Sequence, residues 1–192
     1  MKTCEWVSSD ISRTYHDEEY GRLNLDDDYL FEMLVLETME AGLSFELILQ
    51  KRDAMREAFD GFDYEKIATY DEAKLETFYE NKDLIRNKKK IQAMVSNARA
   101  FIKIREDFGD FKSYLRTFII EPIDYKRREG ESICSSGLSE RLSKDLKKRG
   151  FKFTGPVVIH SFMEAVGLIN NHHTSCPIHD EVNKANKKTR KD

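Results

Sequence analysis

Apolar residues recur at three- and four-residue spacing along most of the chain, which is the period of an amphipathic helix. The clearest stripe follows three consecutive aspartates at 26–28, a sequence that suits the positive end of a helix. Gly42 can end this helix, and Ser44 can cap a second helix that extends to Phe59. The members of the stripe are Leu30, Met33, Leu34, Glu37 and Ala41.

The remaining elements follow the same period, and the alternation that marks strands is scarce. A charged loop is expected at 120–137, because Pro122, Gly130 and Gly137 interrupt it. The sequence therefore predicts an all-α fold. Its further helices are expected at 63–69, 71–79, 88–106, 110–119, 138–149 and 156–167.

Length and composition fit one compact domain. The chain has 192 residues, of which 40% are hydrophobic, so it can bury a substantial core. We expect a single helical domain over residues 1–179 and a basic, flexible tail at 180–192. No apolar run reaches the roughly 18 residues of a membrane span, and the N-terminus lacks the apolar stretch of a signal peptide. We expect a cytoplasmic protein without a membrane partner, and a monomer.

Glu37 shares a helical face with Leu30, Met33 and Leu34, where a carboxylate is costly unless it has a partner. The pattern leaves two interpretations open. The side chain can lie at the edge of the stripe and reach solvent, as most carboxylates do. Alternatively, it is a buried carboxylate that lines a pocket.

Potential metal ligands gather near both ends of the chain. Three cysteines are too few, and odd in number, for a disulfide scaffold. Two of them, with two histidines, could form a closed, tetrahedral, structural zinc site that joins the termini. The alternative is a buried cysteine with unligated surface histidines. The candidate ligands are Cys4, His16, His172 and Cys176, and the competing donors are Cys134, His173 and His179.

A net charge of −3 gives no global argument for nucleic-acid binding, so the argument depends on local clusters. At 146–156 a basic helix end meets a turn bounded by Gly150 and Gly155, and Pro156 starts a new helix. A helix–hairpin–helix of this kind points backbone N–H groups at an anion, which suits a DNA phosphate. The alternative is a solvated basic face. The cations here are Lys144, Lys147, Lys148 and Lys152, and residues 86–90 form a second, less specific basic cluster.

Four aromatic residues lie in the N-terminal region. Close to a buried carboxylate they would form a pocket for a flat, cationic ligand through stacking and cation–π attraction. They can also serve as core or loop anchors. These residues are Trp6, Tyr15, Tyr20 and Phe45.

Together these segments resemble bacterial DNA-3-methyladenine glycosylase I. The resemblance runs from about Cys4 to Cys176, with the motifs in matching order, and its most specific part is the run at 142–153. The other motifs are Cys4-x-Trp6, Tyr15-His16-Asp17-x-Glu19-Tyr20-Gly21, Leu36-Glu37, Ala41-Gly42-Leu43-Ser44, Ile85-Arg86-Asn87, Ser161-Phe162-Met163 and Gly167-Leu168-Ile169-Asn170.

The resemblance implies a helix–hairpin–helix DNA glycosylase fold in which structural zinc joins residues 1–20 to residues 168–179. The implied zinc ligands are Cys4, His16, His172 and Cys176. Glu37 and Tyr15 are implied as catalytic residues, and Trp6, Tyr20 and Phe45 as base-binding residues. The implied DNA contacts are Gly42 and Leu43, which occupy the gap left by the flipped base, and Lys147, Lys148, Gly150, Lys152 and Gly155 on the phosphate backbone.

The implied function is base-excision repair of double-stranded, alkylated DNA. The enzyme would flip 3-methyladenine into its pocket, hydrolyse the N-glycosidic bond and release the free base. The methylated base is cationic in DNA and is therefore already an activated leaving group. Many relatives in the wider superfamily use a catalytic Asp, but the corresponding stretch here offers Asn170 and Asn171. This restricts the expected substrates to lesions with good leaving groups.

The chain also departs from the family's pattern. Tyr20 and Phe45 stand where the family usually has Trp, and Asn171 stands where Asp is common. A catalytically weak paralogue that binds alkylated DNA is therefore the alternative function. A purely structural zinc-pinned helical module is a further alternative, but Glu37 in an apolar stripe speaks against it.

Overall fold

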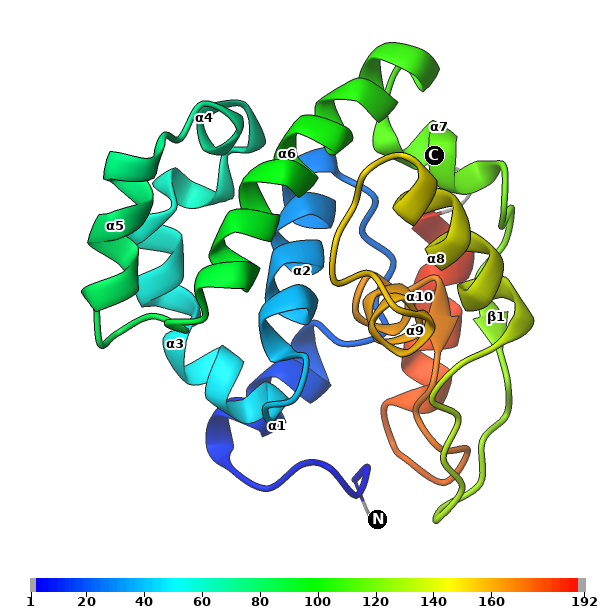
Figure 1. Cartoon of the computed structure of the whole chain (residues 1–192). Coiled ribbons are helices and arrows are strands. Elements are labelled where there is room, and N and C mark those ends of the chain that lie inside the picture. The colour runs from blue at the N-terminus through cyan, green and yellow to red at the C-terminus, as the bar shows by residue number, and fades with distance from the viewer. Residues whose placement is uncertain (1–2, 190–192) are drawn as a thin grey trace.

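The computed structural model describes residues 3–189 and is built almost wholly from helices (Figure 1). This confirms the predicted all-α class. No helix within the described residues is both long and apolar enough to span a membrane. The helices are α1 (Asp10–Glu18), α2 (Asp27–Glu40), α3 (Phe45–Ala58), α4 (Tyr64–Ala68), α5 (Glu72–Glu80), α6 (Lys88–Phe108), α7 (Phe111–Arg116), α8 (Gly137–Lys148), α9 (Pro156–Ala165) and α10 (His179–Thr189), with a 3₁₀ turn at Asp60–Phe62.

Two short strands connect distant segments. Strands β1 (Ile123–Asp124) and β2 (Ile169–Asn170) pair in parallel, with Ile123 opposite Ile169. Strand β1 lies within the predicted loop at 120–137, which is otherwise without regular structure. The pairing fastens this long loop to the segment that follows α9.

Polar caps fix where the two helices of the predicted N-terminal pair begin. The Asp26 side chain accepts hydrogen bonds from the N–H groups of Asp28 and Tyr29 at the start of α2. The Ser44 hydroxyl accepts the N–H of Leu47 at the start of α3. Each cap satisfies a backbone donor that has no partner inside its helix, which is why both starts can be read from the sequence.

Helix α1 is not predicted by the apolar pattern. It begins with a capping box, in which the side chains of Ser9 and Ser12 each bond to the other residue's backbone N–H. Tyr15 and His16 are buried, whereas most of the helix is polar. A nine-residue helix with so short a buried face shows no sustained apolar period.

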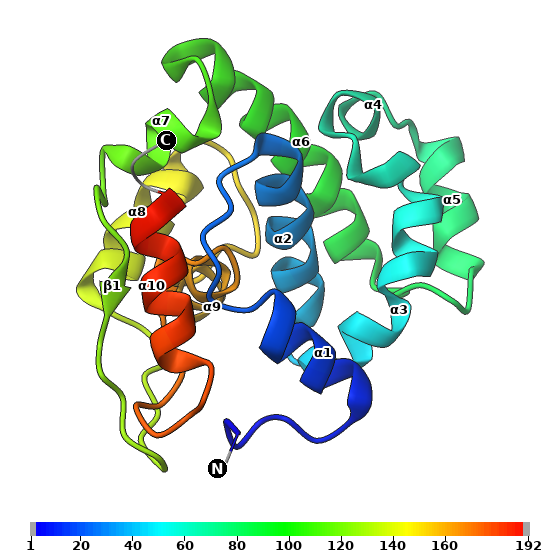
Figure 2. The same ribbon diagram turned by 180° about the vertical axis from the view of Figure 1, so that it is seen from behind.

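The sequence predicts a flexible tail from residue 180, whereas the structure has a helix over most of this segment. Residues His179–Thr189 form α10. Asn186 Nδ2 donates to the carbonyl of Gly21 at 2.8 Å, and its Oδ1 accepts the N–H of Leu23 at 2.8 Å. Figure 2 shows α10 beside the loop that joins α1 to α2. The last part of the predicted tail, residues 190–192, lies outside the described residues.

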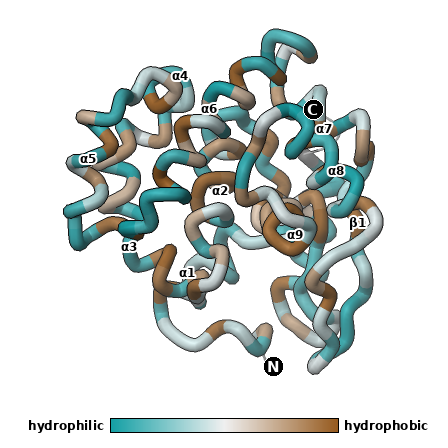
Figure 3. Tube along the Cα trace, in the orientation of Figure 1, coloured by the Kyte–Doolittle hydropathy of each residue, from teal (hydrophilic) through white to brown (hydrophobic). Residues whose placement is uncertain are grey.

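Helix α2 lies at the centre of the molecule. In Figures 1 and 2, α3–α5 lie on one side of it and α8–α10 on the other. It packs against α3, α6 and α9, and Figure 3 shows α9 as another largely hydrophobic helix. Most residues of α2 from 30 to 40 are apolar, and so apolar a helix surface must be buried. Its fully buried apolar residues are Leu30, Phe31, Met33, Leu34, Val35, Leu36 and Met39.

Gly167 marks a close approach between the end of α9 and the α1–α2 loop. Its φ is +78°, and an added Cβ would lie 2.3 Å from both the carbonyl carbon of Arg22 and the nitrogen of Leu23. The adjacent Val166 carbonyl accepts the N–H of Asn24 at 3.1 Å. Only glycine fits here, because both the φ angle and the missing Cβ are required.

We predict that Gly167→Ala destabilises the protein by more than about 3 kcal/mol, because left-handed strain and backbone overlap act together. Gly61→Ala is the matched control, since Gly61 has φ +74° and nothing within 4 Å of the added Cβ. The control should cost about 1–2 kcal/mol. Urea unfolding measures both values, and equal losses would contradict the close approach.

Candidate active site

A cavity of about 340 Å³ opens between the N-terminal segment and helices α1, α2, α3 and α9. Aromatic and acidic side chains dominate its lining, and no Lys or Arg is among the described residues that line it. The cavity therefore suits a flat ligand with positive charge. Its four aromatic residues are Trp6, Tyr15, Tyr20 and Phe45, the same four that the sequence singles out.

The aromatic rings pack edge-on and tilted around this space. Ring centroids are 5.1 Å apart for Trp6 and Tyr20, and 5.0 Å apart for Tyr15 and Phe45. Tyr15 and Tyr20 are buried, whereas Trp6 and Phe45 retain partial exposure. Burial raises the pKa of the Tyr15 phenol well above its ordinary value, and the charge of Glu37 raises it further. Tyr15 therefore presents a neutral hydroxyl.

Glu37 is buried in the cavity and does not reach solvent at the edge of a stripe. It is 3% exposed, and its Oε2 has no hydrogen-bond partner among the described residues. Burial raises its pKa well above the ordinary value, with further contributions from the charge and hydrogen bond of Glu40 and the charge of Glu164. An unpartnered carboxyl oxygen at the wall of a cavity is costly, unless a ligand donates to it.

Glu40 follows Glu37 by one helical turn and shares its wall. Burial raises the pKa of Glu40, while its hydrogen bond with Glu37 and the charge of Lys90 act in the opposite direction. Burial therefore disfavours the charged form of both carboxyls, as their raised pKa values indicate. A cation entering the cavity would favour that charged form.

Lys90 belongs to the basic cluster at 86–90 but faces the interior. It is 4% exposed, and its ammonium donates to the carbonyls of Met39 at 2.8 Å and Ala41 at 2.5 Å. A cation bound to the last carbonyls of α2 stabilises the negative end of that helix. Lys90 therefore holds the end of α2 rather than contributing to an exposed basic surface.

The turn that follows α2 presents the predicted gap-filling residues. Gly42 has φ +82°, and the N–H of Leu43 bonds to the carbonyl of Glu40 at 2.5 Å. The Leu43 side chain is 42% exposed, which is unusual for a leucine beside so apolar a helix. The turn thus projects one apolar side chain outward at the edge of the cavity, between Glu40 and Phe45.

Glu164 is a site residue that sequence reasoning missed. It lines the cavity from α9 and is 8% exposed. Its Oε2 accepts the hydroxyl of Tyr20 at 2.9 Å, and its Oε1 accepts Nδ2 of Asn171 at 2.6 Å. The signal was available, because Glu164 lies among apolar residues of a buried helix, as Glu37 does.

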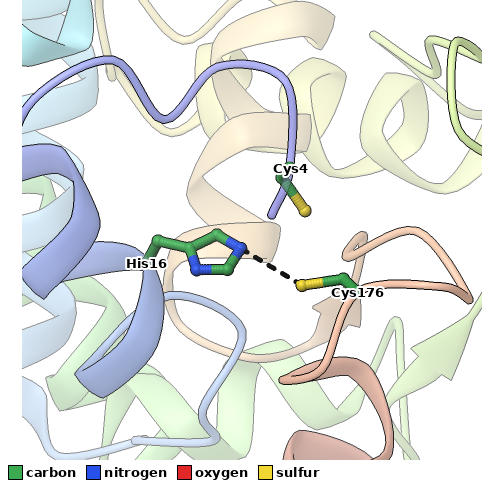
Figure 4. Close-up of side chains that lie close together, drawn as sticks. All are labelled: Cys4, His16 and Cys176. Carbon is green, nitrogen blue, oxygen red and sulfur yellow. Dashed lines mark hydrogen bonds between the residues drawn. The ribbon is translucent and has the colours of Figure 1, made fainter. Parts of the chain in front are cut away.

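Three of the four predicted metal ligands converge. The ligand atoms of Cys4, His16 and Cys176 all lie within 4.8 Å of one another, and all three residues are buried (Figure 4). Cys176 Sγ is 3.5 Å from His16 Nε2. His16 Nδ1 is 2.6 Å from a carboxylate oxygen of Asp17, which orients the ring with Nε2 toward the sulfurs.

The fourth predicted ligand, His172, lies outside this group. Its Nδ1 is 3.0 Å from Oδ1 of Asn170, and its Nε2 is 3.4 Å from the carbonyl of His16. Both ring nitrogens thus face other polar atoms. The competing His173 is also engaged elsewhere, with Nε2 3.2 Å from the carbonyl of Thr3.

The donor set fits a zinc ion. Two thiols and an imidazole are typical zinc ligands, and a carboxylate that bonds to the other ring nitrogen commonly orients such an imidazole. Burial is the main cause that raises the pKa of the Cys4 thiol to about 12. A bound cation would favour the thiolate form of Cys4.

The basic segment forms a rigid turn between α8 and α9. Asn97 fixes it from α6, since its Oδ1 accepts the N–H of Lys152 at 2.8 Å and its Nδ2 donates to the same residue's carbonyl at 3.1 Å. The Ser143 hydroxyl donates to the carbonyl of Thr154 at 2.6 Å. Gly150 has φ +99°, and no side chain caps the start of α9 at Gly155. The side chains of Lys147, Lys148 and Lys152 are exposed on this turn.

The class of enzyme is shown by a family model, described as methyladenine glycosylase, which matches residues 6–179. DNA-3-methyladenine glycosylase 1 of Escherichia coli (strain K12) is 38% identical over 92% of this chain and 96% of that protein. The DNA-3-methyladenine glycosylase of Haemophilus influenzae is 37% identical over 91% of this chain and 96% of that protein. The chain therefore belongs to the DNA-3-methyladenine glycosylase I family, whose members are glycosylase hydrolases.

Solved structures agree with this assignment. A crystal structure of 3-methyladenine DNA glycosylase I superposes with a TM-score of 0.89 at 39% identity, covering 93% of this chain and all of that chain. A structure from Staphylococcus aureus, described as the basis of 3-methyladenine recognition, gives a TM-score of 0.86 at 35% identity, covering 88% of this chain and 92% of that one.

Proposed function

We propose that this protein excises 3-methyladenine from double-stranded, alkylated DNA after flipping the damaged nucleotide into the aromatic cavity. The observation that carries the proposal is the buried, unpartnered Oε2 of Glu37 at the wall of that cavity. The family assignment supports it, and one similar structure is of a glycosylase in complex with 3-methyladenine.

In this mechanism the aromatic rings stack on the flipped base, and Glu37 accepts hydrogen bonds from its polar edge. The base is cationic while attached to the sugar, so the N-glycosidic bond breaks with its electron pair leaving on the base. Water adds to the sugar carbon and loses a proton, and free, neutral 3-methyladenine departs. Tyr15 adds a neutral hydroxyl beside Glu37.

The segment after α9 supplies no additional carboxylate for the sugar. Asn170 stands there, and its Nδ2 donates to the carbonyl of His179 at 3.1 Å and to Oδ1 of Asn183 at 2.9 Å. This residue is thus committed to the contact with α10. Its role supports the proposal that excision depends on the leaving-group quality of a cationic base.

DNA docking in this proposal uses two surfaces. The α8–α9 turn grips the phosphate backbone as a helix–hairpin–helix, through its exposed lysines and the backbone N–H groups near Gly150 and Gly155. Leu43, carried on the Gly42 turn, fills the space that the flipped base leaves. Such contacts position the duplex without reading its sequence.

We further propose that Cys4, His16 and Cys176 bind one structural zinc ion, with His172 as the fourth ligand. The support is the buried convergence of three donors, and the His172 ring centroid lies 4.6 Å from that of His16. The ion would join the N-terminal segment to the segment before α10. Bound zinc supplies charge neutralisation and a cross-link here, and no step of the reaction.

We predict that Glu37→Gln lowers the single-turnover rate of 3-methyladenine release about ten- to a hundred-fold, the range for losing a hydrogen bond to a charged group. Chromatography of bases released from methylated DNA measures it. Glu106→Gln, an exposed change of the same charge, should leave the rate unaltered.

If Glu37→Gln released 3-methyladenine at the wild-type rate, the carboxylate would have a structural role and no part in the reaction. If the wild-type protein itself released no 3-methyladenine but bound alkylated DNA, the weak-paralogue function would be correct. Tyr20 and Phe45 would then be the first residues to replace by Trp, which the family usually has at these positions.

We predict that replacing Lys147, Lys148 and Lys152 by Ala flattens the salt dependence of DNA binding by about three units of slope, one for each phosphate contact. The matched control replaces Lys184, Lys187 and Lys188, three exposed lysines of α10, by Ala. Titration of undamaged duplex at several salt concentrations compares them. If both triple variants had the same salt dependence of DNA binding, the α8–α9 turn would be excluded as the DNA anchor.

We predict one zinc ion per chain in protein purified without chelator. Cys176→Ser should abolish stoichiometric zinc and lower Tm, because zinc bound only to the folded state stabilises it. Cys134→Ser is the control, since Cys134 is exposed. His172→Ala tests the fourth ligand by metal analysis. Zinc-free wild-type protein would refute the site, and full zinc content in His172→Ala would remove that ligand from it.

A further inference from the structure

We infer that Glu164 is a specificity-determining residue, a second base-facing carboxylate that makes the cavity prefer cationic purines to neutral ones. The inference rests on the proposed function, since it concerns the same cavity. It assigns to α9 a part in base recognition that is separate from the hydrogen bonding of Glu37 on α2.

Glu164 lies in the wall between two cavities. The base cavity is on one side, and a second cavity of about 470 Å³ is on the other. The two share four residues, which are Trp6, Tyr20, Ser161 and Glu164. At 8% exposure, the Glu164 side chain has lost most of its contact with bulk water. Its charge is therefore poorly screened toward the base cavity.

The contacts of Glu164 are those of a carboxylate held in one orientation. Tyr20 donates to Oε2, and Asn171 donates to Oε1. His160 Nε2 lies 3.1 Å from Oε1, on the same helix. Two donors on different oxygens fix the plane of the carboxylate, and one of them is the hydroxyl of an aromatic residue that itself lines the base cavity.

The field of Glu164 reaches the groups around the base. Its charge is among the causes that raise the pKa values of Glu37 and Glu40, and it also raises the pKa of Tyr20 after burial. The buried ammonium of Lys90 is committed to the end of α2. Glu164 thus faces the cavity with no cation among the described lining residues to balance it.

This arrangement separates two kinds of recognition. Stacking on the aromatic rings and hydrogen bonds to Glu37 are available to neutral and cationic purines alike. A second fixed negative charge is attractive only to a base that carries positive charge, as a purine does when a ring nitrogen is methylated in DNA. The unpartnered Oε2 of Glu37 is an acceptor that the polar edge of either kind of purine can use.

The test uses Trp6, the single tryptophan of the chain, as a fluorescent reporter inside the cavity. The probes are 3,9-dimethyladeninium, which is permanently cationic, and 9-methyladenine, its neutral counterpart. Wild-type protein should bind the cation more tightly. Glu164→Gln should weaken binding of the cation by about ten-fold and leave binding of the neutral probe unchanged. Glu37→Gln should weaken both, and Glu106→Gln neither.

Glu164→Asp separates charge from packing, because it keeps the carboxylate and shortens the side chain. Retained cation preference in Glu164→Asp, together with its loss in Glu164→Gln, supports the inference. An unchanged preference in folded Glu164→Gln overturns it, as does equal loss of preference in both variants. Failure of the wild-type protein to bind either probe would instead count against the proposed function.

Discussion

The structure depends on the burial of helix α2, in which every residue after Asp28 is buried or half-buried. Such a helix is stabilised by its apolar residues, and any buried charged group on it must find compensation within the protein. Glu37 is such a group, and it lies at the wall of a cavity rather than within close-packed core. Aromatic rings enclose that cavity because they supply apolar area together with faces that attract a cation. The same constraint that builds the core therefore builds the site.

The end of α2 is subject to the same constraint. Its last carbonyls point into the interior, where water cannot satisfy them, and the Lys90 ammonium takes that role from α6. The turn that follows can then project Leu43 outward while Glu40 and Phe45 remain at the cavity. A basic residue in the sequence of this enzyme is thus part of the interior architecture, although its neighbours Lys88 and Lys89 are exposed.

Local signals in the sequence were sufficient for α2, α3 and the α8–α9 turn, because caps, glycines and a sustained apolar period all act within a few residues. They were insufficient for α10, whose order comes from Asn186 bonding to backbone 165 residues away. They also failed for Lys90, since the carbonyls of Met39 and Ala41 that it contacts lie on another part of the chain. The predicted zinc ligands show the same limit. Three converge, while the ring of His172 lies against Asn170.

The cavity draws its walls from both ends of the chain, with Trp6 and Tyr15 on one side and Glu164 on the other. During synthesis the N-terminal helices leave the ribosome long before α9 and α10. The growing chain therefore lacks one wall of the cavity, and the surface of α2 that packs against α9 stays exposed until α9 is made. Contacts of such long sequence separation form slowly, and exposed apolar surface invites association with other chains. Synthesis stopped before residue 164 would consequently yield a fragment that aggregates and is inactive, not a partly active enzyme.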